Sequence, residues 1–399
     1  MDQFQYTVKD QKGLNKTGLI EAADPQAASQ ILHERGFVVI RIQTKPKGIS
    51  FGNFFKGVNI GQIANFTRQL ATMITSGLPL TDSLIVLQKQ TENEKMRVII
   101  TSLADDIQAG NTFASALAKH ADAFSAAYIN IVRSGEASGT LDSVLQKLAD
   151  NLEKEREFQS KVKGAFVYPT IILIAMTLVT AIIMIFVVPK LTELYTNLQI
   201  NLPLPTIILI ATSKFMASFW WLILIGIVAG LISFRRYRKT PQGALLVDSL
   251  IMKLPVLGKL NRDTSLTELA RTLGSLVGAG VPILEALKIA GEVATNAIHR
   301  QAVSRAATLV EKGTTLSKAL SAEDVFPAIL PQMVSVGEET GKMDEVLDKL
   351  AHYFEVEVDQ QVKNLTTALE PIIMIILGIM VGLLVISIVL PIYSITAAF

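Results

Sequence analysis

The chain has 399 residues, half of them hydrophobic, and carries a net charge of only +2. This apolar excess indicates contact with lipid, and the near-neutral charge excludes a chain-wide electrostatic surface for nucleic acid, so no nucleic-acid contact is expected. The absence of cysteine excludes disulfides, thiolate catalysis and cysteine-ligated zinc.

The first residues predict a small separate module. They are polar and lack the apolar core of a signal peptide, so we expect this part of the chain to stay in the cytoplasm. A helix signal begins at Asp24, followed by a proline, and stops at Gly36. Segments with strand character surround it: Phe4–Val8, Thr17–Ala22 and Phe37–Ile42. A ββαβ module over residues 1–44 and a linker over residues 45–59 follow from this pattern.

Three later stretches are long, apolar and free of charge, and each is long enough to cross a bilayer as a helix. The predicted transmembrane helices are residues 165–189, 215–234 and 370–394.

Basic residues beside these stretches predict the orientation of the chain. They lie before the first span, after the second and before the third: Lys161, Lys163, Arg235, Arg236, Arg238, Lys239 and Lys363. By the positive-inside rule these flanks face the cytoplasm. We therefore expect cytoplasmic helical domains at 60–164 and 235–369, a short outer loop at 190–214 and an outer tail at 395–399.

An internal repeat is the most informative feature of the sequence. Residues Phe66–Leu84 recur as Leu269–Leu287, an offset of 203 residues, and Ser134–Ala149 recur as Val336–Ala351, an offset of 202. The repeated unit is a helical domain together with the membrane helix that follows it. The second span is then the extra helix that returns the chain to the cytoplasm.

Each copy reads as about six helices whose last member runs into the membrane. A glycine followed by a proline two residues later, at Gly77 and at Gly280, predicts a tight turn between two helices. Apolar residues at helical spacing form a seam on the last helix of each copy: Leu141, Leu145, Leu148 and Leu152, then Met343, Leu347, Leu350 and Phe354. We expect Pro169 and Pro371 to kink these rods. The predicted fold class is mainly α, a polytopic membrane protein with three transmembrane helices, two repeated cytoplasmic six-helix bundles and a small N-terminal α+β module.

Several motifs carry a family resemblance. A Gly-Glu-x-x-Gly motif occurs at Gly135–Gly139 and again at Gly337–Gly341, and the first and third spans are entered through Tyr168-Pro169 and Leu369-Glu370-Pro371. Over its whole length the chain resembles the inner-membrane platform proteins of type II secretion and type IV pilus machines, the GspF/PilC family.

This resemblance implies a platform in the bacterial inner membrane, dimeric or larger, that works with other inner-membrane machine components. Its cytoplasmic domains are expected to contact a hexameric assembly ATPase, and its spans to guide pilin or pseudopilin subunits from the bilayer into a filament. Whether the filament is a retractable pilus, a secretion pseudopilus or a DNA-uptake filament is left open.

Other classes of function find less support in the sequence. No P-loop, nucleophile elbow, HExxH motif or dinucleotide-binding loop is present, so an enzyme is not expected. The alternative is a component of a transporter or channel, which would show ionisable residues inside its spans. The three predicted spans carry no charge in their interiors.

Candidate metal ligands are Glu153 and Glu157, which stand one helical turn apart. Like charges at this spacing repel each other, so a cation between them would be stabilising. The resemblance adds that some secretion members hold a divalent ion on this helix at a dimer contact, which suggests calcium as a possible cofactor. The competing interpretation is a solvated face on which Glu157 pairs with Lys161.

Candidate partner-binding residues are Glu136 and Glu338 of the duplicated motif. Their structural interpretation is a cap near the N-terminus of the next helix, and their functional interpretation is a contact for the ATPase. Arg68 and Arg271, at matching positions of the repeat, and Glu370 at the mouth of the third span are further candidates. Two GxxxG pairs in the spans are candidates for close helix packing, at a dimer face or elsewhere: Gly226 with Gly230, and Gly378 with Gly382.

Overall fold

The computed structural model describes residues 2–9, 15–22, 29, 31–33, 37–44, 58–197 and 204–398. The chain forms two compact units, Met1–Gly57 and Val58–Phe399.

The first unit is built on a three-stranded antiparallel sheet. Its strands are β1 (Asp2–Lys9), β2 (Asn15–Ala22) and β3 (Val38–Thr44), in the order β2-β1-β3. Residues 31–33, between β2 and β3, are helical. The small α+β module is therefore confirmed. The predicted linker over 45–59 lies outside the described residues except for its last two, where Asn59 caps the first helix of the second unit.

The two copies of the repeat form two six-helix bundles, as predicted. The first consists of α2 (Ile60–Thr75), α3 (Leu80–Gln90), α4 (Glu94–Gln108), α5 (Phe113–Ala118), α6 (Ala126–Ser138) and α7 (Leu141–Ala165). The second consists of α12 (Leu257–Gly278), α13 (Ile283–Val293), α14 (Ala297–Glu311), α15 (Leu316–Ser321), α16 (Ile329–Thr340) and α17 (Met343–Ala398). One contiguous cluster of buried apolar side chains runs through both bundles.

Local sequence explains the first turn in each bundle. Gly77 and Gly280 adopt positive φ angles of 87° and 80°, in the left-handed region that favours glycine, and Pro79 and Pro282 directly precede α3 and α13. The predicted seam faces the core. Leu145 and Leu148 of α7 are buried, and so are the corresponding Leu347 and Leu350 of α17.

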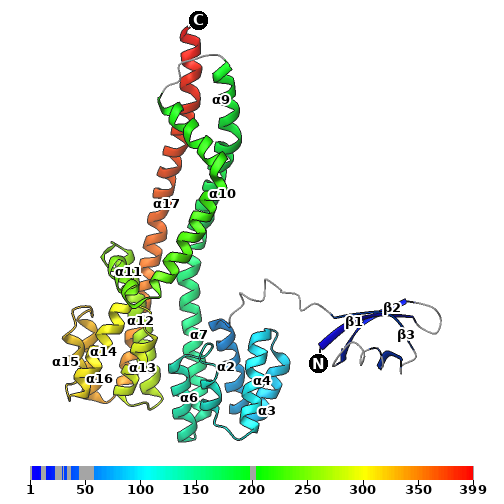
Figure 1. The fold of residues 1–399 in the computed structure, drawn as a ribbon. Coiled ribbons are helices and arrows are strands. Elements are labelled where there is room, and N and C mark those ends of the chain that lie inside the picture. The colour runs from blue at the N-terminus through cyan, green and yellow to red at the C-terminus, as the bar shows by residue number, and fades with distance from the viewer. Residues whose placement is uncertain are drawn as a thin grey trace. The chain divides into compact units, whose positions relative to one another are not determined.

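Within the described part of the chain, three helices are long and apolar enough to cross a membrane, as predicted: Leu141–Lys190, Thr206–Arg238 and Met343–Leu383. The first comprises α7, α8 (Val167–Ile182), a π-helical turn η1 (Ile183–Val187) and the beginning of α9 (Val188–Asn197); the second is α10 (Leu204–Arg238) and the third is α17. In Figure 1, α7 and α17 leave their bundles and run in the same direction, and α17 contacts both α7 and α8.

The predicted ends of several elements are wrong. The expected outer loop over 190–214 is largely helical, because α9 continues to Asn197 and α10 begins at Leu204. The expected outer tail over 395–399 is helical as far as Ala398. After α10 the chain forms one further helix, α11 (Pro241–Lys253), before the six that match the first copy. Loss of apolar character marks where a helix leaves lipid, whereas the helix itself ends only where its backbone hydrogen bonds end.

The prolines act differently in the two rods. α7 ends at Ala165, four residues before Pro169, which is where a proline removes a hydrogen bond and crowds the preceding carbonyl. The π-helical turn η1 likewise ends two residues before Pro189, and the Ser213 hydroxyl of α10 donates to the Met184 carbonyl there. At Pro371, by contrast, α17 continues as one helix of 56 residues, so the proline does not interrupt the second rod. The helix retains its backbone hydrogen bonds on both sides of Pro371, and the one hydrogen bond that the proline removes does not end it.

Candidate functional site

The two bundles meet along one face, which we call the repeat interface. α6 and α7 of the first bundle contact α12, α13 and α17 of the second. The Ser134 hydroxyl donates to the Ala279 carbonyl at 2.6 Å, and the Asn151 amide donates to the Ser275 hydroxyl at 2.8 Å. These bonds join residues that are more than a hundred positions apart in the chain, so the two copies are docked specifically.

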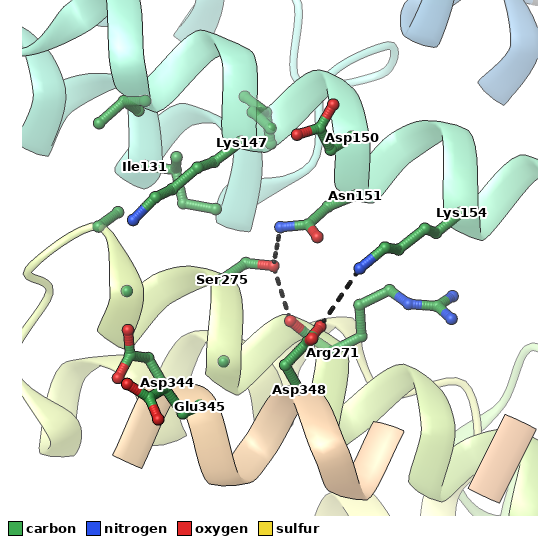
Figure 2. A pocket seen from close by; sticks show the side chains of 15 residues that line it. Ile131, Lys147, Asp150, Asn151, Lys154, Arg271, Ser275, Asp344, Glu345 and Asp348 are labelled. Atoms are coloured by element: carbon green, nitrogen blue, oxygen red, sulfur yellow. Dashed lines mark hydrogen bonds and ion pairs between the residues drawn. The ribbon is translucent and has the colours of Figure 1, made fainter. Parts of the chain in front are cut away.

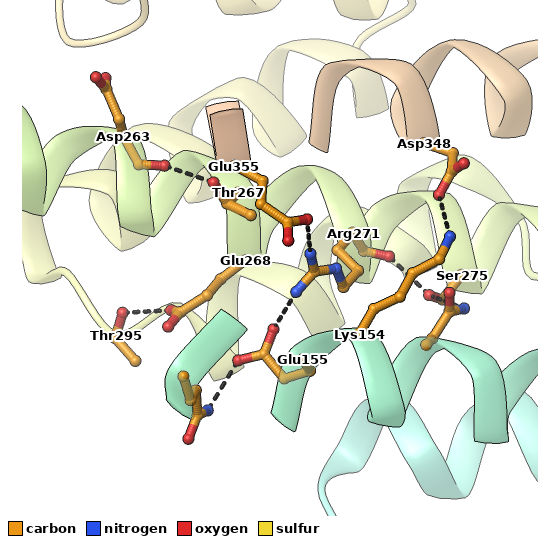
Figure 3. Close-up of polar contacts among 12 residues, drawn as sticks. Lys154, Glu155, Asp263, Thr267, Glu268, Arg271, Ser275, Thr295, Asp348 and Glu355 are labelled. Atoms are coloured by element: carbon orange, nitrogen blue, oxygen red, sulfur yellow. Dashed lines mark hydrogen bonds and ion pairs between the residues drawn. The ribbon is translucent and has the colours of Figure 1, made fainter. Parts of the chain in front are cut away.

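Arg271 lies at the centre of the repeat interface and binds both copies. Its guanidinium on α12 donates to Glu155 of α7 at 2.6 Å and to Glu355 of α17 at 2.8 Å (Figure 3). The side chain is only 7% exposed, and its guanidinium carbon lies 5.5 Å from the centre of the Phe158 ring. A buried arginine shared by two carboxylates ties three helices together, because removing either carboxylate leaves buried charge less well compensated.

A third carboxylate, Glu268, lies beside this bridge. Burial raises its pKa above the ordinary value, and the nearby Glu155 carboxylate contributes in the same direction. The Thr295 hydroxyl donates to Glu268 at 2.6 Å and partly offsets this effect. The arginine is therefore surrounded by more acidic groups than it can neutralise.

A cleft of about 300 Å³ opens beside Arg271 between the two bundles. Figure 2 shows Lys147 and Lys154 on its α7 side and the acidic residues Asp344, Glu345 and Asp348 on its α17 side. Lys154 and Asp348 form an ion pair across it at 3.5 Å. Opposite charges on the two walls favour the docked arrangement, although exposed pairs such as this contribute little each.

Arg68, which matches Arg271 in the repeat, makes a similar bridge that stays within the first bundle. It donates to Glu153 at 2.6 and 2.7 Å and also binds Asp150. These hydrogen bonds raise the pKa of Arg68 and lower that of Glu153. Sequence comparison of the two copies correctly placed the arginines at matching positions, but it gave no sign that one is shared between the copies and the other is not.

The predicted metal ligands are ion-paired in the single chain. Glu153 binds Arg68, and Glu157 lies 3.4 Å from Lys161. Among the residues that the structure describes, no group of three or more histidine, aspartate or glutamate side chains is arranged to hold a metal ion. Calcium at a contact between two chains stays a prediction.

The duplicated Gly-Glu-x-x-Gly motif has a structural role in each bundle. Glu136 accepts hydrogen bonds from the backbone N–H groups of Phe113 at 2.7 Å and Ala114 at 3.1 Å. In the second bundle Glu338 accepts from Leu316 at 2.6 Å and Ser317 at 3.1 Å. Each glutamate therefore caps a short helix, α5 or α15.

The expected cap on the next helix is wrong in its target, because the capped helix precedes the motif in the chain. Gly135 and Glu136 belong to the last turn of α6 rather than to a loop. An added Cβ at Gly135 would lie 2.9 Å from Val144, so this glycine lets α6 and α7 pack closely. Gly139 ends α6 with a φ of 73°. All three fixed positions of the motif thus serve the packing of the bundle.

The remaining candidates lie along the membrane-spanning helices. Glu370 is exposed on α17. At all four glycines of the GxxxG pairs, no other part of the chain lies within 4 Å of an added Cβ. These glycines therefore do not pack against another helix of the same chain among the described residues, and packing against a second chain stays a prediction.

Sequence reasoning missed Glu155 and a buried polar cluster in the second bundle. The His299 ring is fully buried, its Nδ1 atom lies 2.7 Å from the Ser265 hydroxyl, and burial lowers its pKa to about 4. Asp263, also buried, accepts from the Gln361 amide at 2.6 Å. Glu155 lies between the two predicted metal ligands in sequence, but only the docking of the bundles distinguishes it from them.

Comparison with known proteins gives matches along the whole chain. Residues 66–189 and 269–391 match the family described as type II secretion system (T2SS), protein F, and residues 1–43 match the N-terminal domain of that protein. The type IV pilus assembly protein PilC of Thermus thermophilus is 38% identical over 400 residues, covering 99% of this chain and 98% of that protein. The type II secretion system protein F of Xanthomonas campestris is 34% identical over 405 residues, which cover 100% of both chains. The type IV pilus assembly protein PilC of Myxococcus xanthus is 33% identical over 400 residues, covering 99% of this chain and 95% of that protein.

Proposed function

Because this chain belongs to the protein F family of type II secretion systems, we propose that it is a non-enzymatic membrane platform for the assembly of a type IV pilus or a secretion pseudopilus. A hexameric cytoplasmic ATPase supplies the work, and pilin or pseudopilin subunits leave the bilayer beside the spans. The platform is a homo-oligomer and works with other inner-membrane components of the machine.

The orientation that this function requires agrees with the charges at the ends of the spans. α10 carries Arg235, Arg236 and Arg238 in its last turn, and only α11 separates it from the second bundle. The positive-inside rule then places both bundles in the cytoplasm and the C-terminus outside. An ATPase in the cytoplasm can reach both bundles in this arrangement.

The Arg271 bridge is the observation that carries the proposal. Each bundle ends in a helix that continues into the membrane, as a stretch of 50 residues from Leu141 and as a helix of 56 residues from Met343. Arg271 binds Glu155 on the first rod and Glu355 on the second. A movement of either bundle is therefore transmitted to both rods, which is what a platform needs to act on subunits in the bilayer.

Replacing Glu155 with alanine tests this coupling. Arg271 keeps Glu355, so we expect the variant to insert in the membrane and to retain the ATPase in pull-down from native membranes. We expect filament assembly to fall severalfold, measured as sheared surface filaments or as secreted substrate in cells that lack the natural copy.

The control is Asp142→Ala, which removes a carboxylate from an exposed position in the first turn of the same helix. We expect this control to assemble filaments at a level close to that of the unaltered chain. Normal assembly by the Glu155 variant, or an equal loss in both variants, would contradict the proposed coupling.

A further inference from the structure

The repeat interface is asymmetric, because the two bundles use different surfaces to contact each other. If a two-fold axis related the two bundles, each contact across the interface would occur twice, with the copies exchanged. The bond from Ser134 to Ala279 would then be matched by a contact from Val336 to Ser76, the equivalent positions by the offsets of 202 and 203 residues. Val336 is instead 48% exposed, and Ser76 is exposed as well.

Each bundle therefore has one exposed surface whose counterpart on the other bundle lies in the repeat interface. On the second bundle, Val336, Tyr353 and Val356 match Ser134, Asn151 and Lys154, three residues that bind across the repeat interface. Val336 lies on α16 and the other two on α17, and we call these three residues the open α17 face.

The open α17 face is more apolar than its used counterpart. Tyr353 is 43% exposed and Val356 is 53% exposed, in a cytoplasmic bundle whose other large apolar residues are mostly buried. A cluster of exposed apolar residues outside the spans marks an interaction site.

On the first bundle the unused half lies at the end of α2 and the turn that follows. Thr72, Ser76 and Leu78 match Ser275, Ala279 and Val281 of the second bundle, and we call them the open α2 face. Leu78 is 36% exposed, whereas Val281, a member of the buried cluster that runs through both bundles, is 8% exposed. The same position in the fold is thus buried in one copy and left open in the other.

The charges of the two open faces also complement each other. Arg68 and Glu357 occupy the positions of Arg271 and Glu155, whose ion pair crosses the repeat interface at 2.6 Å. The Arg68 side chain, which binds Glu153 and Asp150, is 27% exposed, and that of Glu357, which pairs with Lys259 at 2.9 Å, is 36% exposed. Both ion pairs are therefore accessible from outside the chain. The partner that these features fit is a second copy of the same chain.

We propose that the open α17 face of one chain docks on the open α2 face of a second copy of the same chain, in the geometry of the repeat interface. Glu357 of one chain then joins Glu153 on Arg68 of the next, as Glu155 joins Glu355 on Arg271 within one chain. This inference rests on the homo-oligomer included in the proposed function, and it names the surfaces that form it.

The membrane permits this head-to-tail arrangement. α7 and α17 leave their bundles in the same direction, so the operation that relates the two copies keeps both rods in one bilayer. Applying it again places the spans of the next chain in the same bilayer. Head-to-tail contacts close into a ring when the rotation permits and otherwise continue as an open array.

Cysteine cross-linking in native membranes tests the proposal directly, because the chain contains no cysteine of its own. Two differently tagged chains, one Ser76→Cys and one Val336→Cys, are expressed together and treated with a short bis-maleimide. We expect a cross-linked dimer that carries both tags, and none when either variant is expressed alone. Ser134→Cys with Ala279→Cys in one chain provides the benchmark for a cross-link across the repeat interface.

Three results would overturn the proposal. A Val336→Cys chain that cross-links to itself indicates a two-fold contact, and one that cross-links to the ATPase gives the open α17 face a different occupant. Absence of the mixed dimer, while the benchmark pair reacts, excludes the docking.

Val98→Cys, exposed on α4, replaces Val336→Cys as the control for random collision.

A second variant separates this inference from the platform role. Tyr353→Glu places a charge on the open α17 face at a partly exposed position, and we expect it to abolish the mixed dimer while the ATPase still copurifies. If the mixed dimer persists in this variant, the surface is misassigned. If the ATPase does not copurify with the unaltered chain, the platform role is refuted and the docking result is unaffected.

Discussion

Removing the carboxylate of Glu136 should loosen one short helix without unfolding the bundle. The first three N–H groups of α5 all have side-chain acceptors: Glu136 accepts from Phe113 and Ala114, and Thr112 accepts from Ser115. In Glu136→Ala the two partly buried donors, the N–H groups of Phe113 and Ala114, lose a charged acceptor.

The expected loss follows from these two bonds. Hydrogen bonds to charged groups contribute about 1.5–3 kcal/mol each, and water replaces part of this at a helix end, so we expect about 2 kcal/mol of local stability to be lost. At about 1.4 kcal/mol per factor of ten, the amides of Phe113 and Ala114 should exchange with solvent roughly 30-fold faster. Glu136→Gln keeps one acceptor oxygen and should show a smaller increase.

Hydrogen exchange followed by mass spectrometry on the full chain in detergent or nanodiscs measures this change in the α5 peptide. Glu92→Ala, an exposed change in the loop between α3 and α4, is the control and should leave that peptide unaltered. Unchanged exchange in the α5 peptide of Glu136→Ala, with the rest of the bundle intact, would show that the cap contributes nothing. It would return the motif to the alternative role of an ATPase contact.

Three further predictions concern the charged groups of the bundles. Burial lowers the pKa of His299 to about 4, below its value of about 6.5 in an unfolded chain, so the unfolded state binds the proton first as the pH falls. The free energy of unfolding should therefore fall by about 3 kcal/mol between pH 6.5 and pH 4. The measurement is the melting temperature, which should show this decrease in the unaltered chain and lack it in His299→Gln. A double-mutant cycle of Arg271→Ala and Glu155→Ala should give a coupling of about 1–3 kcal/mol in thermal unfolding, and an additive result would mean that the pair does not couple the copies. Calcium should raise the melting temperature or the dimer fraction of the chain only if Glu153 and Glu157 of two chains share an ion; a titration without effect, or an equal effect on the Glu157→Gln variant, dismisses that site.

Sequence patterns predicted the helices of both bundles because their signals are local. The glycine and proline around Leu78 define a turn within a few residues, and the leucine seam of α7 repeats at the helical period. Likewise, the three spans follow from runs of apolar residues. The ends of α9 and α10 were misplaced because the loss of hydrophobicity near residues 190–214 indicates where the chain leaves lipid and carries no information on where the helix stops.

The partners of the charged residues were beyond the reach of sequence reasoning. Glu136 caps a helix that begins 23 residues earlier, since the two helices pack side by side in the bundle. Arg68 and Arg271 look equivalent in the repeat, yet only Arg271 reaches a carboxylate of the other copy. Neither fact has a signal at short range in the chain.

The sequence by itself determined that this protein has two copies of one helical bundle, each continuing into a bilayer, because periodicity, turn residues and hydrophobicity act over a few residues at a time. The tertiary structure alone decided how the two copies dock. That docking brings Glu155, rather than Glu153 or Glu157, to an arginine of the other copy. Corresponding surfaces of the two copies acquire different environments only when one bundle packs against the other in a single orientation, and residues more than a hundred positions apart fix that orientation.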